Sequence, residues 1–345
     1  MKHLAGVLMV AFSCSVAATL VAQGDAPAPW AYGFSAPPSP AGAPAAAPAP
    51  NSPAPPPDTS PHTVPGSDVK LTRQQVGNGF NVGDWFPSDH PKMPYIVQYG
   101  KAPQVRACGL CHLINGKGRP ENASVSGLPV AYFLQQLYDF RNDLRKSADS
   151  RKANTNAMIT IAKGMSDEEM RAAAEYFAQM PFNTPWIKVV ESATAPRTRN
   201  AGGMWMSLEN GETEPIAGRI MEMPVDNELV ELRDYHPEGS FIAYVPPGSI
   251  KRGEAIATNG ARVTACSACH GADLQGLGPV PGLAGRSPSY VARQLYDMRQ
   301  GTRKGPWVSL MKPIVDKLSA DDILDVTAYV ASLPVGSRPP QTAER

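Results

Sequence analysis

The sequence predicts an all-α protein in which two similar helical domains follow one another, joined by a long, partly extended linker. Three observations support this prediction: an internal repeat, the helical spacing of apolar residues within each copy, and short apolar runs bounded by glycine and proline between the copies. With 345 residues, the chain has room for two or three domains of ordinary size.

Two stretches carry the repeat. Residues 132–141 (YFLQQLYDFR) match residues 290–299 (YVARQLYDMR) at an offset of 158 (290 − 132). Residues 158–170 match residues 311–323 at an offset of 153 (311 − 158), so the first copy has five more residues in the loop before this stretch. Each copy is expected to form one helical domain of about 90 to 100 residues.

Apolar spacing and capping residues locate the helices. Apolar side chains recur at helical spacing within 132–141, which predicts an amphipathic helix. Ser166 and Ser319 are each followed by an acidic residue three positions on, the pattern of a capping box. The last helix of each copy is therefore expected at 167–179 and at 320–332, where a proline follows closely.

The N-terminus is predicted to direct export. A short basic start at residues 1–3 is followed by an apolar run to residue 22, as in a secretory signal peptide; a retained membrane anchor is the alternative. Residues 24–66 are rich in proline and alanine and are expected to form a semi-rigid tether that buries no apolar core.

The chain is divided on these grounds into six segments. They are a signal peptide or N-terminal anchor at 1–23, a Pro/Ala-rich tether at 24–66, a first helical domain at 85–184, an interdomain segment at 185–247, a second helical domain at 248–338 and a tail at 339–345. Within the interdomain segment, residues 216–223, 229–232 and 241–245 are expected to be short strands or extended connectors. A small subdomain and a long strap both fit this pattern.

Net charge favours no particular class of partner. The 32 Lys and Arg residues nearly balance the 31 Asp and Glu residues. The sequence has no basic field of the kind that binds nucleic acid, so a nucleic-acid partner is not expected.

The cysteine pattern is the strongest indication of function in this sequence. Of the five cysteines, Cys14 lies in the predicted leader and the other four fall in two identical frames, CGLCH at 108–112 and CSACH at 266–270. A Cys-x-x-Cys-His frame is the attachment site of c-type haem, because one helical turn lets both sulfurs form thioethers with the haem vinyl groups while the imidazole reaches the iron. The frames predict two covalently bound haem c groups, held by Cys108, Cys111 and His112 and by Cys266, Cys269 and His270.

Two other uses of paired cysteines fit less well. Four thiolates could hold zinc, but each pair heads its own copy of the repeat and is followed by a histidine both times. A thioredoxin-like redox pair needs a βαβ context, which the sequence lacks.

The repeat also indicates the sixth iron ligand. Met158 and Met311 are the only methionines that match between the copies, at a similar distance after each frame, whereas Met298 corresponds to Phe140 and is expected in the core. Ligation by histidine and methionine fills both axial positions of the iron and raises the reduction potential relative to two histidines. The pattern favours electron transfer over bond chemistry at iron.

Further residues are expected around each haem. The free ring nitrogen of each iron-binding histidine normally donates to a carbonyl, and Pro120 and Pro279 are candidates to provide it, with turn formation as their simpler role. Four recurring residues on the helix faces contact either the macrocycle and its propionates or the protein core alone: Tyr138, Tyr296, Arg141 and Arg299.

These residues resemble class I cytochrome c domains of the tandem di-haem kind, over roughly residues 100–184 and 249–336. The resemblance implies His112 and Met158 as ligands of one iron, and His270 and Met311 as ligands of the other. It also implies periplasmic electron transfer with a redox protein as partner, such as a dehydrogenase, an oxidase or another cytochrome. Any membrane association is expected through the N-terminus.

The two copies differ at their start. The second copy has a plausible first helix at 249–259, whereas prolines interrupt the corresponding part of the first copy, whose opening helix is expected to be short or missing.

An enzyme is the alternative to a carrier. A di-haem oxidoreductase of the peroxidase or thiosulfate dehydrogenase type would need a labile or unusual ligand on one iron. A histidine ligand of that kind would have to come from His62, His90 or His236, outside the two matched copies.

Overall fold

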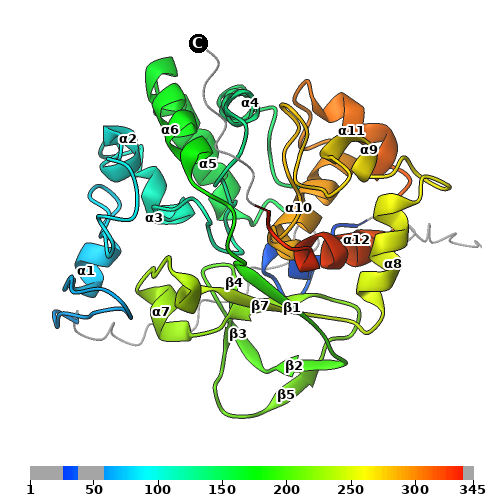
Figure 1. The fold of residues 1–345 in the computed structure, drawn as a ribbon, viewed down its shortest axis with the longest axis horizontal. Coiled ribbons are helices and arrows are strands. Elements are labelled where there is room, and N and C mark those ends of the chain that lie inside the picture. The colour runs from blue at the N-terminus through cyan, green and yellow to red at the C-terminus, as the bar shows by residue number, and fades with distance from the viewer. Residues whose placement is uncertain (1–25, 38–57, 337–345) are drawn as a thin grey trace, which may run out of the picture.

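The computed structural model describes residues 26–37 and 58–336. In Figure 1 the helices of the first copy, in cyan and green, lie beside those of the second, in yellow to red, and the strands lie along the lower side of both. None of the helices in the described ranges has the length and apolarity needed to cross a membrane. The predicted leader and tail lie outside the described residues, as do residues 38–57 of the predicted tether.

The first copy is helical, as predicted. Its helices are α2 (Tyr95–Gln98), α3 (Cys108–His112), α4 (Val130–Arg141), α5 (Ala153–Gly164) and α6 (Asp167–Gln179). The expected capping box is present, since the Ser166 hydroxyl accepts from the Glu169 amide and the Glu169 carboxylate accepts from the Ser166 amide. The opening helix α2 has only four residues, which confirms that it is short.

The second copy repeats this order. Its helices are α8 (Ser249–Thr258), α9 (Ser267–His270), α10 (Pro288–Arg299), α11 (Val308–Val315) and α12 (Ala320–Ser332). The predicted opening helix is α8, with ten residues. It packs closely on α12 at Gly253, where a Cβ atom would lie 2.0 Å from the backbone oxygen of Asp325, so no larger residue fits there.

The interdomain segment is a small β-subdomain rather than a strap. Its strands are β1 (Ile187–Glu191), β2 (Thr194–Pro196), β3 (Thr198–Ala201), β4 (Met204–Ser207), β5 (Thr213–Pro215), β6 (Met221–Pro224) and β7 (Phe241–Val245). β1 pairs in parallel with β7, and β7 pairs antiparallel with β6, giving a three-stranded sheet in the order β1-β7-β6. β2 pairs with β5 and β3 with β4, both antiparallel.

The expectations for short strands are partly wrong. Residues 241–245 form β7 as predicted, but the strand expected at 216–223 begins only at Met221. Residues 229–232 are not extended: they belong to α7 (Asn227–Glu231) and its end. The reason is local, because the Asp226 carboxylate accepts a hydrogen bond from the Leu229 amide and caps a helical turn that a short apolar run does not reveal.

The predicted tether also differs from expectation where it is described. Residues Pro29–Tyr32 form a 3₁₀-helix, η1, that packs against α10, and Trp30, Ala31 and Tyr32 are buried. The Tyr32 hydroxyl donates to Asp297 at 2.9 Å, and Arg293 donates to the carbonyl of Ala31 at 2.7 Å. Two aromatic side chains are enough to give this short part of a Pro/Ala-rich segment an apolar contact.

Residues 58–93 precede the first copy and wrap beside it. They contain α1 (Arg73–Val76) and a bridge between His62 and Leu71. Val64 at the end of the predicted tether is 3% exposed, so this end too contributes to the core. One connected apolar core runs through both copies, and a smaller cluster around Trp205 lies under the β-subdomain.

Candidate haem sites

Each Cys-x-x-Cys-His frame folds into one short helical turn, α3 in the first copy and α9 in the second. No disulfide joins the four cysteines in the described residues, so each sulfur is available to form a thioether. In the described ranges no three His, Cys, Asp or Glu side chains come together as a metal-binding group, so the two pairs do not form the joint zinc site that was the alternative.

A backbone carbonyl fixes the imidazole of each frame. His112 Nδ1 donates to the carbonyl of Ala123, and His270 Nδ1 donates to that of Pro281, both at 2.8 Å. Because Nδ1 carries the proton, Nε2 keeps its lone pair for a metal. Burial lowers the pKa of both histidines, which also favours the neutral, ligating form.

The two proline candidates for this role were wrong. The acceptor lies 11 residues after the histidine in both copies, at Ala123 and Pro281. The Pro120 carbonyl instead accepts a hydrogen bond from Arg293 at 2.7 Å. The acceptor is a backbone atom, so the path of the loop selects it and the residue type does not.

Met158 and His112 line the same cavity. This open cavity has an apolar wall that includes Phe133, Leu137 and Phe140. Met158 is half-buried on α5, and Met311, its counterpart, is half-buried on α11 against the core of the second copy. By contrast, methionines of the first copy that match apolar residues in the second are core residues: Met165, Met170 and Met180.

The polar wall of the cavity carries more cations than anions. The Lys152 amine is 3% exposed and has no hydrogen-bond partner, and burial lowers its pKa to about 7. A buried amine of this kind fits an anionic group in the cavity. The charged residues of the lining are Arg145, Lys146, Lys152 and Arg293 against Glu121 and Asp297.

The residues present therefore fit a haem. Free thiols and an imidazole lie on one helical turn, an apolar wall suits the macrocycle, and cations suit the propionates. Bound haem supplies a one-electron iron couple whose potential depends on its axial ligands and surroundings.

Comparison with known proteins agrees with this geometry. The cytochrome c family model matches residues 97–181 and 250–334, one match for each copy. Cytochrome c4 of Azotobacter vinelandii is 35% identical over 232 residues, covering 66% of this chain and 84% of that protein. The chain belongs to the cytochrome c family. It has two cytochrome c domains in tandem and two covalently bound haem c groups, and its function is electron transfer.

Two further relatives match different shares of this chain, one over a single short stretch and one over most of its length. Cytochrome c-554(548) of Halomonas halodenitrificans is 43% identical over 72 residues, covering 21% of this chain and 87% of that protein. A thiosulfate dehydrogenase electron acceptor of Stutzerimonas stutzeri is 28% identical over 240 residues, covering 69% of this chain and 83% of that protein. The family matches leave out residues 182–249, which contain the β-subdomain.

The two cytochrome c domains meet through a paired hydrogen-bond network. Arg145 of the first domain donates to Tyr290 at 2.8 Å and to Gln294 at 2.9 Å, both in the second. Arg303 of the second domain donates to Tyr132 at 3.0 Å and to Gln136 at 2.8 Å in the first. These residues correspond pairwise at the repeat offset of 158: Tyr132 and Tyr290, Gln136 and Gln294, Arg145 and Arg303. The sequence analysis did not predict this interface, although the recurrence of the three residues in both copies was the signal for it.

The recurring Arg141 and Arg299 hold the fold together. Arg141 donates to the carbonyl of Met165 and Arg299 to that of Leu318, each at 2.8 Å, which ties α4 and α10 to the loop before the last helix. Each guanidinium also lies over a tyrosine ring, Tyr138 or Tyr296. Within the described residues, the lining of the cavity in the first domain includes neither Tyr138 nor Arg141, so packing is the role that the structure favours for these two.

Proposed function

We propose that this chain is a periplasmic carrier that moves single electrons between a dehydrogenase or respiratory complex and a terminal acceptor, with His112 and Met158 as ligands of the first iron and His270 and Met311 as ligands of the second. The observation that carries the proposal is the pairing of His112 with Met158 in one cavity, together with the matched position of Met311. Two filled axial positions suit a carrier, because substrate then has no site on the iron.

The remaining histidines support the same ligand set. In the described part of the chain these are His62, His90 and His236, and each has a carboxylate partner: Asp58 at 2.8 Å, Asp84 at 3.1 Å and Asp89 at 3.0 Å. In the described structure, none of the three lines the cavity that His112 and Met158 share. The di-haem oxidoreductase therefore ranks second.

An optical spectrum of the haem-loaded protein tests the ligands. We expect both ferric haems to be low-spin and to show the weak near-infrared band of methionine sulfur on ferric iron. A high-spin haem, or one without the sulfur band, would reject the carrier proposal in favour of an enzyme with an open or different iron ligand.

The proposed donor is a thiosulfate-oxidising dehydrogenase. The support is the similarity to the electron acceptor of Stutzerimonas stutzeri, which spans most of both proteins. Mixing the oxidised holoprotein with thiosulfate and catalytic amounts of a thiosulfate dehydrogenase should reduce both haems, and thiosulfate alone should reduce neither. No reduction in the complete mixture would point to a different donor.

Export is proposed from the N-terminal signal. N-terminal sequencing of the protein recovered from the periplasm should begin near residue 23 if the signal is cleaved. Recovery in the cytoplasm with the leader intact and without haem would contradict the periplasmic location.

A further inference from the structure

The two haem-attachment turns have opposite exposure at equivalent positions. Leu110 is 5% exposed and Ile114 is 2% exposed in the first domain. Their counterparts at the offset of 158, Ala268 and Ala272, are exposed, as is Cys269. The contrast continues along the loop, where Leu277 is 59% exposed.

A cap covers the first turn, and we define it as residues 58–90 together with residues 227–236. Arg233 donates to the carbonyl of Leu110, which lies between the two cysteines of the first frame. Asn115, just after that frame, donates to the carbonyl of Tyr235 at 2.6 Å. Burial lowers the pKa of Arg233 to about 10, so its guanidinium stays charged at neutral pH beside Cys111.

The β-subdomain extends this cover along the same loop. The Trp186 indole donates to the carbonyl of Gly118 at 2.9 Å, and the Lys117 amine lies 5.2 Å from the Trp186 ring centroid. Both residues are buried, with Trp186 3% and Lys117 8% exposed. This part of the loop after His112, at Lys117 and Gly118, is thus covered by Trp186, which lies outside the two family matches.

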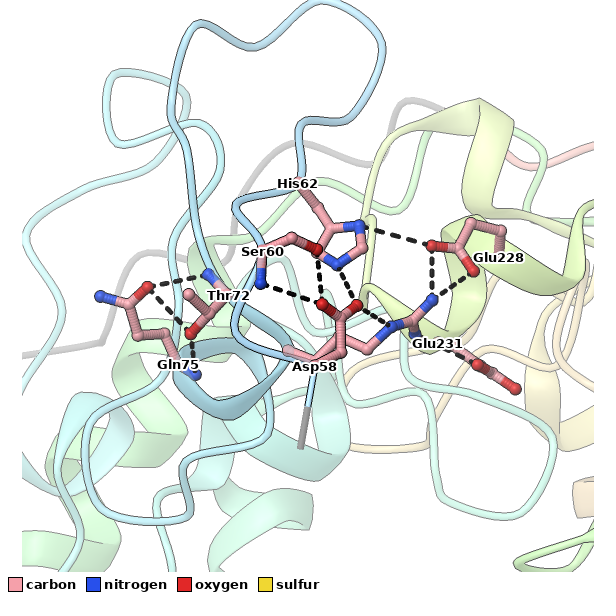
Figure 2. A network of polar contacts seen from close by, with 8 residues as sticks. Asp58, Ser60, His62, Thr72, Gln75, Glu228 and Glu231 are labelled. Atoms are coloured by element: carbon pink, nitrogen blue, oxygen red, sulfur yellow. Dashed lines mark hydrogen bonds and ion pairs between the residues drawn. The ribbon is translucent and has the colours of Figure 1, made fainter. Parts of the chain in front are cut away.

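The two parts of the cap hold one another in place. The Trp85 indole donates to the carbonyl of Leu232 at 2.7 Å, next to Arg233, and the Tyr235 hydroxyl donates to Asp84 at 2.8 Å. On the outer side of this contact, Arg73 forms ion pairs with Asp58, Glu228 and Glu231. Figure 2 shows Asp58 beside His62, with Glu228 and Glu231 of α7 across from them. The Arg233 backbone has φ of 55°, a rare conformation for arginine that these contacts impose.

The second turn is exposed and nearly free of charge. Between residues 265 and 281, Asp273 is the one acidic or basic residue besides His270. In the described part of the chain, Ala268, Ala272 and Leu277 form an apolar, solvent-facing rim around the attachment turn. Exposed apolar side chains that gather at a cofactor attachment site are typical of a protein interface.

We infer that the turn of the second domain, residues 266–279, is the docking surface for a redox protein, whereas the cap keeps partners from the attachment turn of the first domain. This inference rests on the carrier function proposed above. The occupant is a protein with an apolar contact patch and few charges, because Asp273 alone offers a charged contact. Association should therefore depend little on ionic strength.

Glutamate substitutions test the surface. Leu277→Glu places a charge on the docking turn, and Val225→Glu is a matched control on the β-subdomain, since Val225 is also 59% exposed. The probe is a reduced mono-haem cytochrome c mixed with oxidised holoprotein in a stopped-flow spectrometer. Leu277→Glu should slow the bimolecular rate at least about 10-fold, whereas Val225→Glu should leave it within about two-fold of the unchanged protein.

A second variant and a small reagent separate the possible failures. Ala268→Glu, on the same turn, should slow the cytochrome c reaction as Leu277→Glu does, and both variants should still be reduced by hexaammineruthenium(II). Unchanged rates with cytochrome c in both variants would overturn this inference and leave the carrier function intact. A holoprotein that exchanges electrons with neither reagent would reject the carrier function itself.

Concentration dependence identifies a different occupant. If the turn binds a second copy of this chain, the rate constant with cytochrome c should fall as the concentration of unchanged holoprotein rises, and Leu277→Glu should abolish that fall. This outcome would overturn the assignment to a different redox protein. A rate constant independent of holoprotein concentration supports it.

Discussion

The two attachment turns differ in solvent exposure, and the difference is opposite to the one that their residues suggest. The first, over residues 106–123, carries Arg106, Lys117, Arg119 and Glu121, yet most of it is buried. The second, over residues 264–281, carries one carboxylate and is largely exposed. Exposure here is decided by what the rest of the chain packs against each turn.

The difference lies in what was added outside the repeat. The first domain lacks a long opening helix, and residues 58–90 with the loop after α7 occupy the neighbouring space. The second domain keeps its opening helix α8 packed on α12, away from its attachment turn. One repeat thus gives a covered site and an open site, which two identical domains could not provide.

Removing the main apolar anchor of the cap should have the largest effect. Trp85 is 1% exposed, so Trp85→Ala should cost about 3–5 kcal/mol of local stability and expose the first turn. Hydrogen exchange should show lost protection of the amides at 107–113 and unchanged protection at 265–271. Trp205→Ala, in the separate apolar cluster, is the control that should leave both turns unchanged.

Replacing the two methionines proposed as ligands should change the potentials of the two haems separately. Met158→His should lower the potential of the first haem by on the order of 100 mV, and Met311→His should do the same to the second, because histidine stabilises ferric iron relative to methionine. Redox titration followed by optical spectra measures both. Met223→Leu, in the separate apolar cluster of the β-subdomain, should shift neither potential; a ligand variant that behaves like this control would show that its methionine does not bind iron.

The helices and the attachment residues were predictable from sequence, because both depend on local patterns. Ser166 and Ser319 cap their helices through residues three positions away, and the frames of His112 and His270 are contiguous. The repeat also predicts Met158 as a ligand, since a match at similar spacing distinguishes it from the core methionines.

The rest depended on contacts distant in sequence. The pairing of Ile187 with Phe241 builds the β-subdomain, and no periodicity within either strand reveals it. Tyr32 reaches Asp297 across 265 residues, and Arg233 reaches Leu110 across 123 residues. Such contacts decide which turn is covered, so the asymmetry of the sites could not be predicted from the repeat.

Removing the positive charge of Arg233 in the cap should change the reduction potential of the first haem and leave that of the second unchanged. Arg233→Gln removes a positive charge near Cys111. Loss of this charge stabilises the ferric state, so the potential of the first haem should fall by about 60 mV, the equivalent of about 1.4 kcal/mol. Arg252→Gln, which breaks an ion pair with Asp325 in the second domain, is the control and should leave the first haem unchanged. Equal potentials in Arg233→Gln and the unchanged protein would show that the guanidinium lies too far from the iron to matter.

The smallest expected effect is a pH dependence of the stability of the cap. The hydrogen bond to Asp84 raises the pKa of His90 above its ordinary 6.5, with the Pro91 carbonyl and the charge of Asp89 acting in the same direction against burial. A raised pKa means that this pair stabilises the folded cap fully below pH 6.5 and that the contribution is lost as the pH rises through the folded value.

The pKa shifts of Asp84 and His90 together define the pH range in which the cap is most stable. Burial would raise the pKa of Asp84, but hydrogen bonds from His90 and Tyr235 outweigh it and lower the pKa, so the contribution of Asp84 is lost as the pH falls below about 4. The cap should therefore be most stable between about pH 4 and 6.5 and looser at pH 8, by less than about 1 kcal/mol. Hydrogen exchange at residues 84–90, corrected for intrinsic rates, measures this, and His90→Gln should remove the slope above pH 6.5. Protection that rises between pH 6 and 8 would mean that the folded cap lowers the pKa of His90 and that the His90–Asp84 pair does not stabilise the cap.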